Sequence, residues 1–110
     1  MAAANVDRQI RALAGDRRRQ ILELVRDNEL AAGEIAAHFD VTRPAVSQHL
    51  TVLKDAGLVT ERRDGTRRLY RAEPDGLLGL KQFVDRFWAT GLTKIKREAE
   101  AEWARTPRGD

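Results

Sequence analysis

Apolar residues recur at three- and four-residue steps over most of the chain, which is the spacing of helices that bury one face. A first short helix is predicted from Asn5 and a second from Asp16, because either side chain can cap a helix N-terminus. A third helix is expected over about 33–39, and a fourth from a Thr42 cap to about Ala56. The apolar residues expected to face inward from these four helices are Val6, Ile10, Leu13, Ile21, Leu24, Val25, Ile35, Ala36, Phe39, Val46, Leu50 and Leu53.

The period then changes to two residues, which indicates strands. Residues 58–63 and 66–72 flank the dipeptide Asp64-Gly65, a strong signal for a tight β-hairpin. A two-residue turn at this dipeptide predicts that Glu61 lies opposite Arg68 across the two strands.

These elements together predict a mainly α fold with a β-hairpin wing. Residues 40–42 are a three-residue connection between two short helices, so residues 33–56 form a helix-turn-helix, and the hairpin at about 58–72 makes it a winged helix-turn-helix. From about residue 75 to 104 the helical period returns, which brings the number of helices to five. The whole chain, 1–110, is expected to be one domain.

The fourth predicted helix carries short polar side chains where a solubilising surface would carry Glu and Lys. On a helical wheel with Val46 at the centre of the buried face, these polar side chains fall on another side. Arg favours guanine, Gln favours adenine, and Ser or Thr contacts either base in the major groove. The residues expected to read DNA bases are Arg43, Ser47, Gln48 and Thr51, with Thr42 and Lys54 beside them as contacts to phosphates.

The wing brings several cations onto a narrow ribbon. Arg62, Arg63, Arg67 and Arg68 surround its tip, which suits phosphates or a minor groove. Alternatively, these charges only keep an edge strand in solution and prevent aggregation. Their position directly after a helix-turn-helix favours DNA contact.

Composition narrows the possible functions further. The formal net charge is +3, the chain has no cysteine, and no apolar run approaches the roughly 18 residues that span a bilayer. We therefore expect a cytoplasmic protein without disulfides, membrane segment or cofactor. Ser47 and His49 point about 160° apart on a helix, so they cannot act as nucleophile and base, and an enzyme is not expected.

Three stretches resemble the ArsR family of bacterial winged-helix regulators. They are "IRALAGDRRRQILELV", "AAGEIAAHFDVTRPAVSQHLTVLKDAGLVTERRDGTRRLYR" and the long helix that follows, which together cover about nine-tenths of the chain. The segment "DRFW", in a chain without cysteine, is similar to a metal-independent, autorepressor-like branch.

The resemblance implies a homodimeric repressor that binds double-stranded DNA at an imperfect palindrome. Family members read bases with the first residue of the recognition helix and with a serine and its neighbour one turn later, which match Arg43, Ser47 and Gln48. Arg43 stands where the family more often has Gln. Many members hold metals through cysteines of the third helix or through His and carboxylate pairs of the last helix. This chain has no cysteine, and its last helix has no His, so no metal site is expected.

A last helix of nearly thirty residues would extend about 40 Å, longer than a small winged helix can cover. We therefore expect a homodimer that buries the exposed part of this helix and part of the first helix. Alternatively, the aromatic half packs on its own domain and the acidic end is solvated. The predicted interface residues are Ile10, Leu13, Val84, Phe87, Trp88, Ile95 and Trp103.

Two other functions stay open at this stage. The winged helix could be a protein-interaction module without specific DNA binding, or a nucleoid-associated protein that binds any duplex with similar affinity. The operator, the regulated genes and any small-molecule effector do not follow from the residues.

Overall fold

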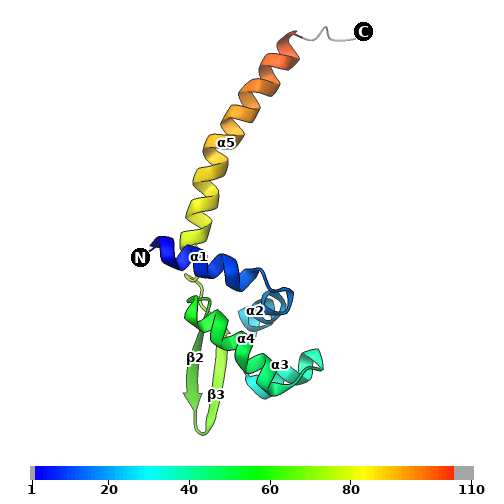
Figure 1. Cartoon of the computed structure of the whole chain (residues 1–110), viewed down its shortest axis with the longest axis vertical. Helices are drawn as coiled ribbons and strands as arrows, with labels where there is room; N and C mark the ends of the chain where they lie inside the picture. The colour runs from blue at the N-terminus through cyan, green and yellow to red at the C-terminus, as the bar shows by residue number, and fades with distance from the viewer. Residues whose placement is uncertain (1, 106–110) are drawn as a thin grey trace. The chain divides into compact units, whose positions relative to one another are not determined.

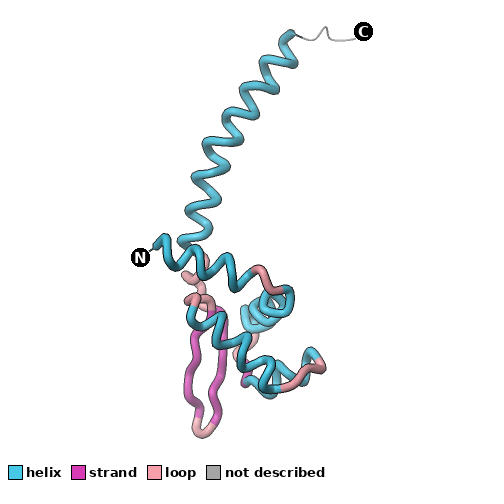
Figure 2. The backbone as a smooth tube through the Cα atoms, viewed as in Figure 1, coloured by secondary structure: helices cyan, strands magenta, loops and turns pink. Residues whose placement is uncertain are grey.

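The computed structural model describes residues 2–105, and the side chains of residues 6–104. Figure 1 shows the helices and strands in chain order, and Figure 2 shows the backbone by secondary structure. The chain divides into two compact units, one that ends at Leu80 and one that begins at Lys81. The elements are α1 (Ala2–Leu13), α2 (Asp16–Asp27), β1 (Leu30–Ala31), α3 (Ala32–Phe39), α4 (Arg43–Asp55), β2 (Val59–Asp64), β3 (Arg67–Ala72) and α5 (Leu78–Arg105).

The five predicted helices and the hairpin are all present, with shifts at several ends. α1 begins at Ala2, before the predicted start at Asn5, and α2 is preceded by Gly15 as its N-cap where Asp16 was expected. α5 begins at Leu78, three residues after the predicted start. In the described part of the chain, no helix is both long and apolar enough to span a bilayer.

Arginines close the junction between α1 and α2. The Nε of Arg18 donates to the carbonyl oxygen of Ala12 at 2.7 Å, and Arg19 donates to that of Leu13 at 2.6 Å. The last carbonyls of a helix have no partner within the helix, and cationic donors there are favourable. Two cations of the basic stretch at residues 17–19 therefore stabilise the fold.

The helix-turn-helix connection is set by local chemistry. Asp40 adopts a left-handed backbone with φ 55° and ends α3. Thr42 caps α4, because its Oγ1 accepts a hydrogen bond from the amide of Ala45 at 3.2 Å. α3 begins at Ala32, and the amide of its N-cap residue, Ala31, donates to the Glu34 carboxylate at 3.0 Å. The predicted Thr42 cap is thus confirmed.

The sheet has three antiparallel strands in the order β1-β3-β2, one more strand than the predicted hairpin. β1 pairs Leu30 with Tyr70. The predicted hairpin register was wrong by two residues, because Glu61 lies opposite Tyr70 rather than Arg68. The loop is Gly65-Thr66, with a positive φ of 65° at the glycine, which fits a turn with glycine at its first central position.

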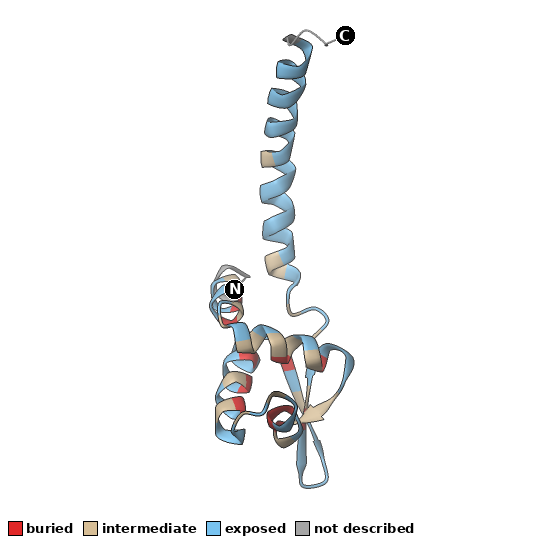
Figure 3. Cartoon of the chain, turned by 90° about the vertical axis from the view of Figure 1, so that its right-hand side faces the viewer, coloured by how far each residue is buried: buried red, intermediate tan, exposed pale blue. Residues whose placement is uncertain are grey.

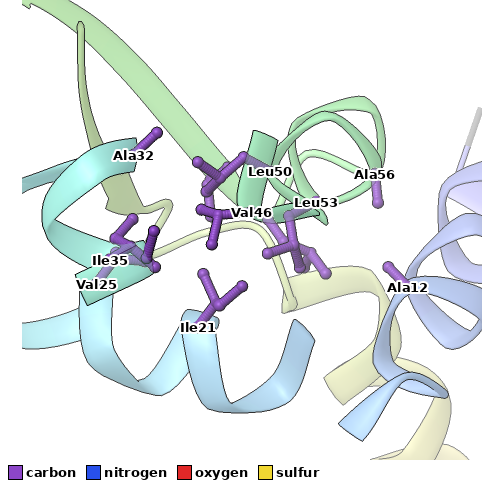
Figure 4. Packing of buried hydrophobic residues seen from close by; sticks show 12 residues of the cluster. Ala12, Ile21, Val25, Ala32, Ile35, Val46, Leu50, Leu53 and Ala56 are labelled. Carbon is purple, nitrogen blue, oxygen red and sulfur yellow. The ribbon is translucent and has the colours of Figure 1, made fainter. Parts of the chain in front are cut away.

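The core lies between α2, α3, α4 and the base of the strands. Figure 3 shows burial concentrated there and exposure along the outer part of the hairpin. In Figure 4, Val46, Leu50 and Leu53 of α4 point toward Ile21 of α2 and Ile35 of α3. All five of these side chains are at most 1% exposed, so the buried face of α4 is the predicted one.

A buried glutamine joins three segments of the first unit. Gln9 of α1 is 5% exposed, and its Nε2 donates to the carbonyl oxygens of Gly76 at 2.5 Å and Ala56 at 3.5 Å. A Cβ on Gly76 would lie 2.5 Å from the carbonyl oxygen of Gly57, so the chain before α5 packs closely against the end of α4. The sequence pattern predicted neither contact.

Candidate nucleic-acid interface

The exposed face of α4 carries all four predicted base-reading side chains. Arg43, Ser47, Gln48 and Thr51 are exposed, whereas Leu50 on the other face is buried. The helix therefore presents hydrogen-bonding groups of several lengths to the exterior while its other face is anchored in the core. A helix of this kind fits the major groove of B-DNA.

The Thr51 hydroxyl has a defined direction on this face. Its Oγ1 donates to the carbonyl oxygen of Ser47 at 3.0 Å, so the hydroxyl proton is engaged within the helix. The lone pairs of Thr51 stay available to accept from adenine N6 or cytosine N4, and its methyl group can contact thymine. Nothing within the helix engages the Ser47 hydroxyl in this way.

A groove of about 830 Å³ lies between the start of α3, the first turns of α4 and the wing. We call it the wing groove. The start of α3 supplies small residues, and the polar side chains that line the groove are Glu34, Arg43, Ser47, Thr66, Arg67, Arg68 and Tyr70. One sugar-phosphate strand separates a major groove from the adjacent minor groove, so a helix in one and a hairpin in the other would enclose a phosphate strand between them.

Three of the five cations predicted to hold phosphates are paired with carboxylates of the same chain. Lys54 Nζ lies 2.7 Å from Glu61, and Arg62 makes two contacts with Glu29, at 2.5 Å and 3.0 Å. Arg67 pairs with Glu34. The other two cations of this set, Arg63 and Arg68, form no ion pair with a described residue.

These ion pairs also shift the acidity of their members. The hydrogen bond from Arg62 holds the pKa of Glu29 below its usual range, and the hydrogen bond from Lys54 does the same for Glu61. Burial, followed by the Glu61 charge, raises the pKa of Tyr70. Glu29 and Glu61 are therefore ionised at neutral pH and oppose the positive charge of their partners.

Residues 15–61 match the family described as "Bacterial regulatory protein, arsR family". The HTH-type transcriptional regulator Rv2034 of Mycobacterium tuberculosis is 48% identical over 96 residues, which cover 87% of this chain and 90% of that protein. The chain belongs to the ArsR family. It is a DNA-binding transcriptional regulator and not an enzyme.

Two further comparisons are informative. The transcriptional repressor SdpR of Bacillus subtilis is 38% identical over 55 residues, which cover 50% of this chain and 61% of that protein. Among solved structures, the homodimeric winged helix-turn-helix DNA-binding domain of Mb0332 from Mycobacterium bovis is 39% identical, with a TM-score of 0.65. That match covers 77% of this chain and 82% of the other, and it agrees with the winged-helix fold.

In this ArsR-family chain, the predicted interface residues of α5 are exposed. Phe87 is 57% exposed and stacks on Phe83 with ring centroids 6.4 Å apart, and Trp88 meets the Phe87 ring edge-on at 5.1 Å. Leu92, which the sequence analysis omitted, is 52% exposed. It lies four residues after Trp88, so helical spacing could have identified it.

The two predicted interface residues of α1 lie in different environments. Ile10 is 49% exposed, whereas Leu13 is half-buried and packs against the core cluster of its own chain. Leu13 therefore already has an intrachain role. Its assignment to an interface stays a prediction.

Neither histidine has the surroundings of a metal ligand pair. His38 makes an edge contact with Phe39, and the half-buried His49 has a pKa lowered by burial and then by the charges of Arg18 and Arg17. Among the described residues, no three His, Cys, Asp or Glu side chains form a group that could hold a metal ion.

Proposed function

We propose that this ArsR-family regulator is a homodimeric repressor that binds an imperfect palindrome in promoter DNA. The observation that carries the proposal is the exposure of Ser47 and Thr51 on α4, opposite the buried Val46, Leu50 and Leu53. A surface of short polar groups on a helix anchored from behind suits base recognition.

The four side chains on this face would read bases, and the surrounding residues would position the protein on the backbone. Base readers are Arg43, Ser47, Gln48 and Thr51. Backbone or minor-groove contacts are Thr42, Lys54, Arg62, Arg63, Arg67 and Arg68. Because contacts to phosphates carry no sequence information, mutations in the two sets should have different effects on DNA binding.

A homodimer would supply the second recognition helix. One helix-turn-helix reads a single half-site, and two related by a twofold axis read half-sites about one helical turn apart. Exposed apolar side chains on α5 and the homodimeric relative from Mycobacterium bovis support this part of the proposal. The interface would comprise Ile10, Leu13, Val84, Phe87, Trp88, Leu92, Ile95 and Trp103.

Release from DNA would not depend on a thiophilic metal. The chain has no cysteine, and thiolates are the ligands that such metals favour. Similarity to SdpR, which is named a transcriptional repressor, supports the proposal that binding represses transcription.

The test is a comparison of base discrimination among variants. Duplexes are first enriched from a random library with the wild-type protein, and dissociation constants are then measured by fluorescence anisotropy for every single base-pair change in one half-site. Ser47→Ala or Gln48→Ala should lose about 1–3 kcal/mol of discrimination at a particular base pair. Arg68→Ala should weaken binding to all duplexes similarly and lower the salt slope by about 0.9 per half-site.

Lys81→Ala serves as the control, because Lys81 is an exposed cation of α5 that pairs with Asp85. It should change neither discrimination nor the slope. If the wild-type protein binds enriched and scrambled duplexes equally, or if Ser47→Ala and Arg68→Ala have the same effect on every duplex, the proposal is wrong.

A further inference from the structure

Two carboxylates pair with wing arginines, but only one of them lies in the wing groove. Glu34 lines this groove and pairs with Arg67, whereas Glu29 pairs with Arg62 and is not among the lining residues. Glu34 is thus a negative charge at a place where a phosphate strand would run.

The position of Glu34 is fixed from two sides. Its Oε1 accepts a hydrogen bond from the Ala31 amide at 3.0 Å. The same oxygen also accepts a hydrogen bond from Nη2 of Arg67. The first contact belongs to the capping of α3, so the carboxylate is held at the start of that helix.

Arg68 has different surroundings from Arg67, its neighbour in the same strand. It lies directly opposite Arg63 in the strand register, and neither arginine forms an ion pair with a described residue. Like charges directly opposite each other across two strands are unfavourable, and an anion between or beside them relieves the repulsion. Arg43, the other groove cation, likewise forms no ion pair with a described residue.

We propose that Glu34 restrains the affinity of the wing for DNA in general, whatever the DNA sequence. It neutralises Arg67, so Arg68 holds the phosphate strand in the wing groove. This inference rests on the proposed function, because it assumes that the wing groove encloses a DNA strand. It also revises the role of Arg67, which becomes the partner of Glu34 instead of a phosphate ligand.

The ion pair between Glu34 and Arg67 would limit DNA affinity even if DNA could separate the two side chains. When Arg67 leaves Glu34 to bind a phosphate, one counterion leaves the DNA, but the freed carboxylate attracts a cation in return. The net release of ions is then close to zero, so Arg67 adds little to the salt dependence of binding. Lowering this sequence-independent part of the affinity weakens binding to every duplex by a similar factor.

The experiment is a double-mutant cycle on DNA binding with Glu34→Gln, Arg67→Ala and the double variant. Each protein is titrated with an enriched duplex and a scrambled duplex of the same length at several salt concentrations. Gln keeps an oxygen for the Ala31 amide and is itself a favoured residue at this capping position, so α3 should stay folded. Thermal unfolding of every variant checks this.

The expected results differ in sign. Glu34→Gln should tighten binding to both duplexes and steepen the salt slope by about 0.9 per half-site, because Arg67 becomes available to a phosphate. Arg67→Ala should weaken binding, since it leaves Glu34 unneutralised in the groove. The double variant should return to within about threefold of the wild type, because it removes both charges together.

Asp27→Asn is the matched control. It also removes one carboxylate and frees one arginine, Arg26, but neither residue lines the wing groove. If Glu34→Gln has no larger effect than Asp27→Asn, or if the double variant binds as weakly as Arg67→Ala, the inference is overturned. Failure of the proposed function would be distinguishable, because the wild-type protein would then not prefer the enriched duplex at all.

Discussion

Replacing Trp88 with alanine should strongly weaken dimer formation. The Trp88 side chain is 46% exposed in the single chain. Of the roughly 200 Å² that such a side chain presents, about 100 Å² is then available for burial. At about 25 cal/mol per Å² this gives about 2.5 kcal/mol per protomer, and twofold symmetry doubles it to about 5 kcal/mol per dimer.

Only part of this free energy is expected to contribute to dimer affinity, because the ordering of side chains at the interface costs free energy. If half or more of this roughly 5 kcal/mol contributes to the dimer affinity, Trp88→Ala should raise the dimer dissociation constant by about 60-fold to 4,000-fold. Sedimentation equilibrium measures the constant, and circular dichroism checks that α5 stays helical. Gln82→Ala, a polar position on the same helix outside the predicted interface, is the control and should leave the constant unchanged. A change of less than about threefold for Trp88→Ala would refute the placement of this residue in the interface.

Two further predictions concern stability. Gly76→Ala should lower the free energy of unfolding in urea by about 1–3 kcal/mol, because its Cβ would lie 2.5 Å from the Gly57 carbonyl oxygen. Gly33→Ala, whose Cβ meets nothing within 4 Å, is the control and should be neutral or stabilising; equal losses would contradict the packing argument. Because burial and then the charge of Arg18 lower the pKa of His49, the unfolded state binds more protons, and stability should fall as the pH drops through about 6.5. His49→Gln should reduce this pH dependence of the unfolding free energy, and an unchanged dependence would exclude His49 as its cause.

Local signals account for most of what the sequence predicted correctly about the fold. The Thr42 cap depends on residues within one turn of the helix end, so it can be read from a short stretch. The hairpin register was wrong because the loop is Gly65-Thr66 instead of Asp64-Gly65. A shift of two residues leaves each side chain on its predicted face, so the exposure of the wing was still predicted correctly.

Contacts between distant residues account for what the sequence did not predict. β1 has only two residues, and its partner Tyr70 lies forty residues after Leu30. Gln9 was not expected inside, because a helical pattern cannot show that the carbonyl oxygen of Gly76 lies within its reach. Neither feature has a periodic or capping signal that would reveal it.

The charges of the proposed DNA-binding surface also depend on contacts between distant residues. The sequence suggested that four wing arginines contact DNA, namely Arg62, Arg63, Arg67 and Arg68. Arg62 and Arg67, however, each meet a carboxylate 33 residues away in the chain. Composition cannot distinguish such an arginine from Arg68, which is also exposed and forms no ion pair with a described residue. The fold creates this difference by placing β1 and the start of α3 beside β3. We therefore expect the affinity for the phosphate backbone to depend on the positions of Glu29 and Glu34 as well as on the number of arginines.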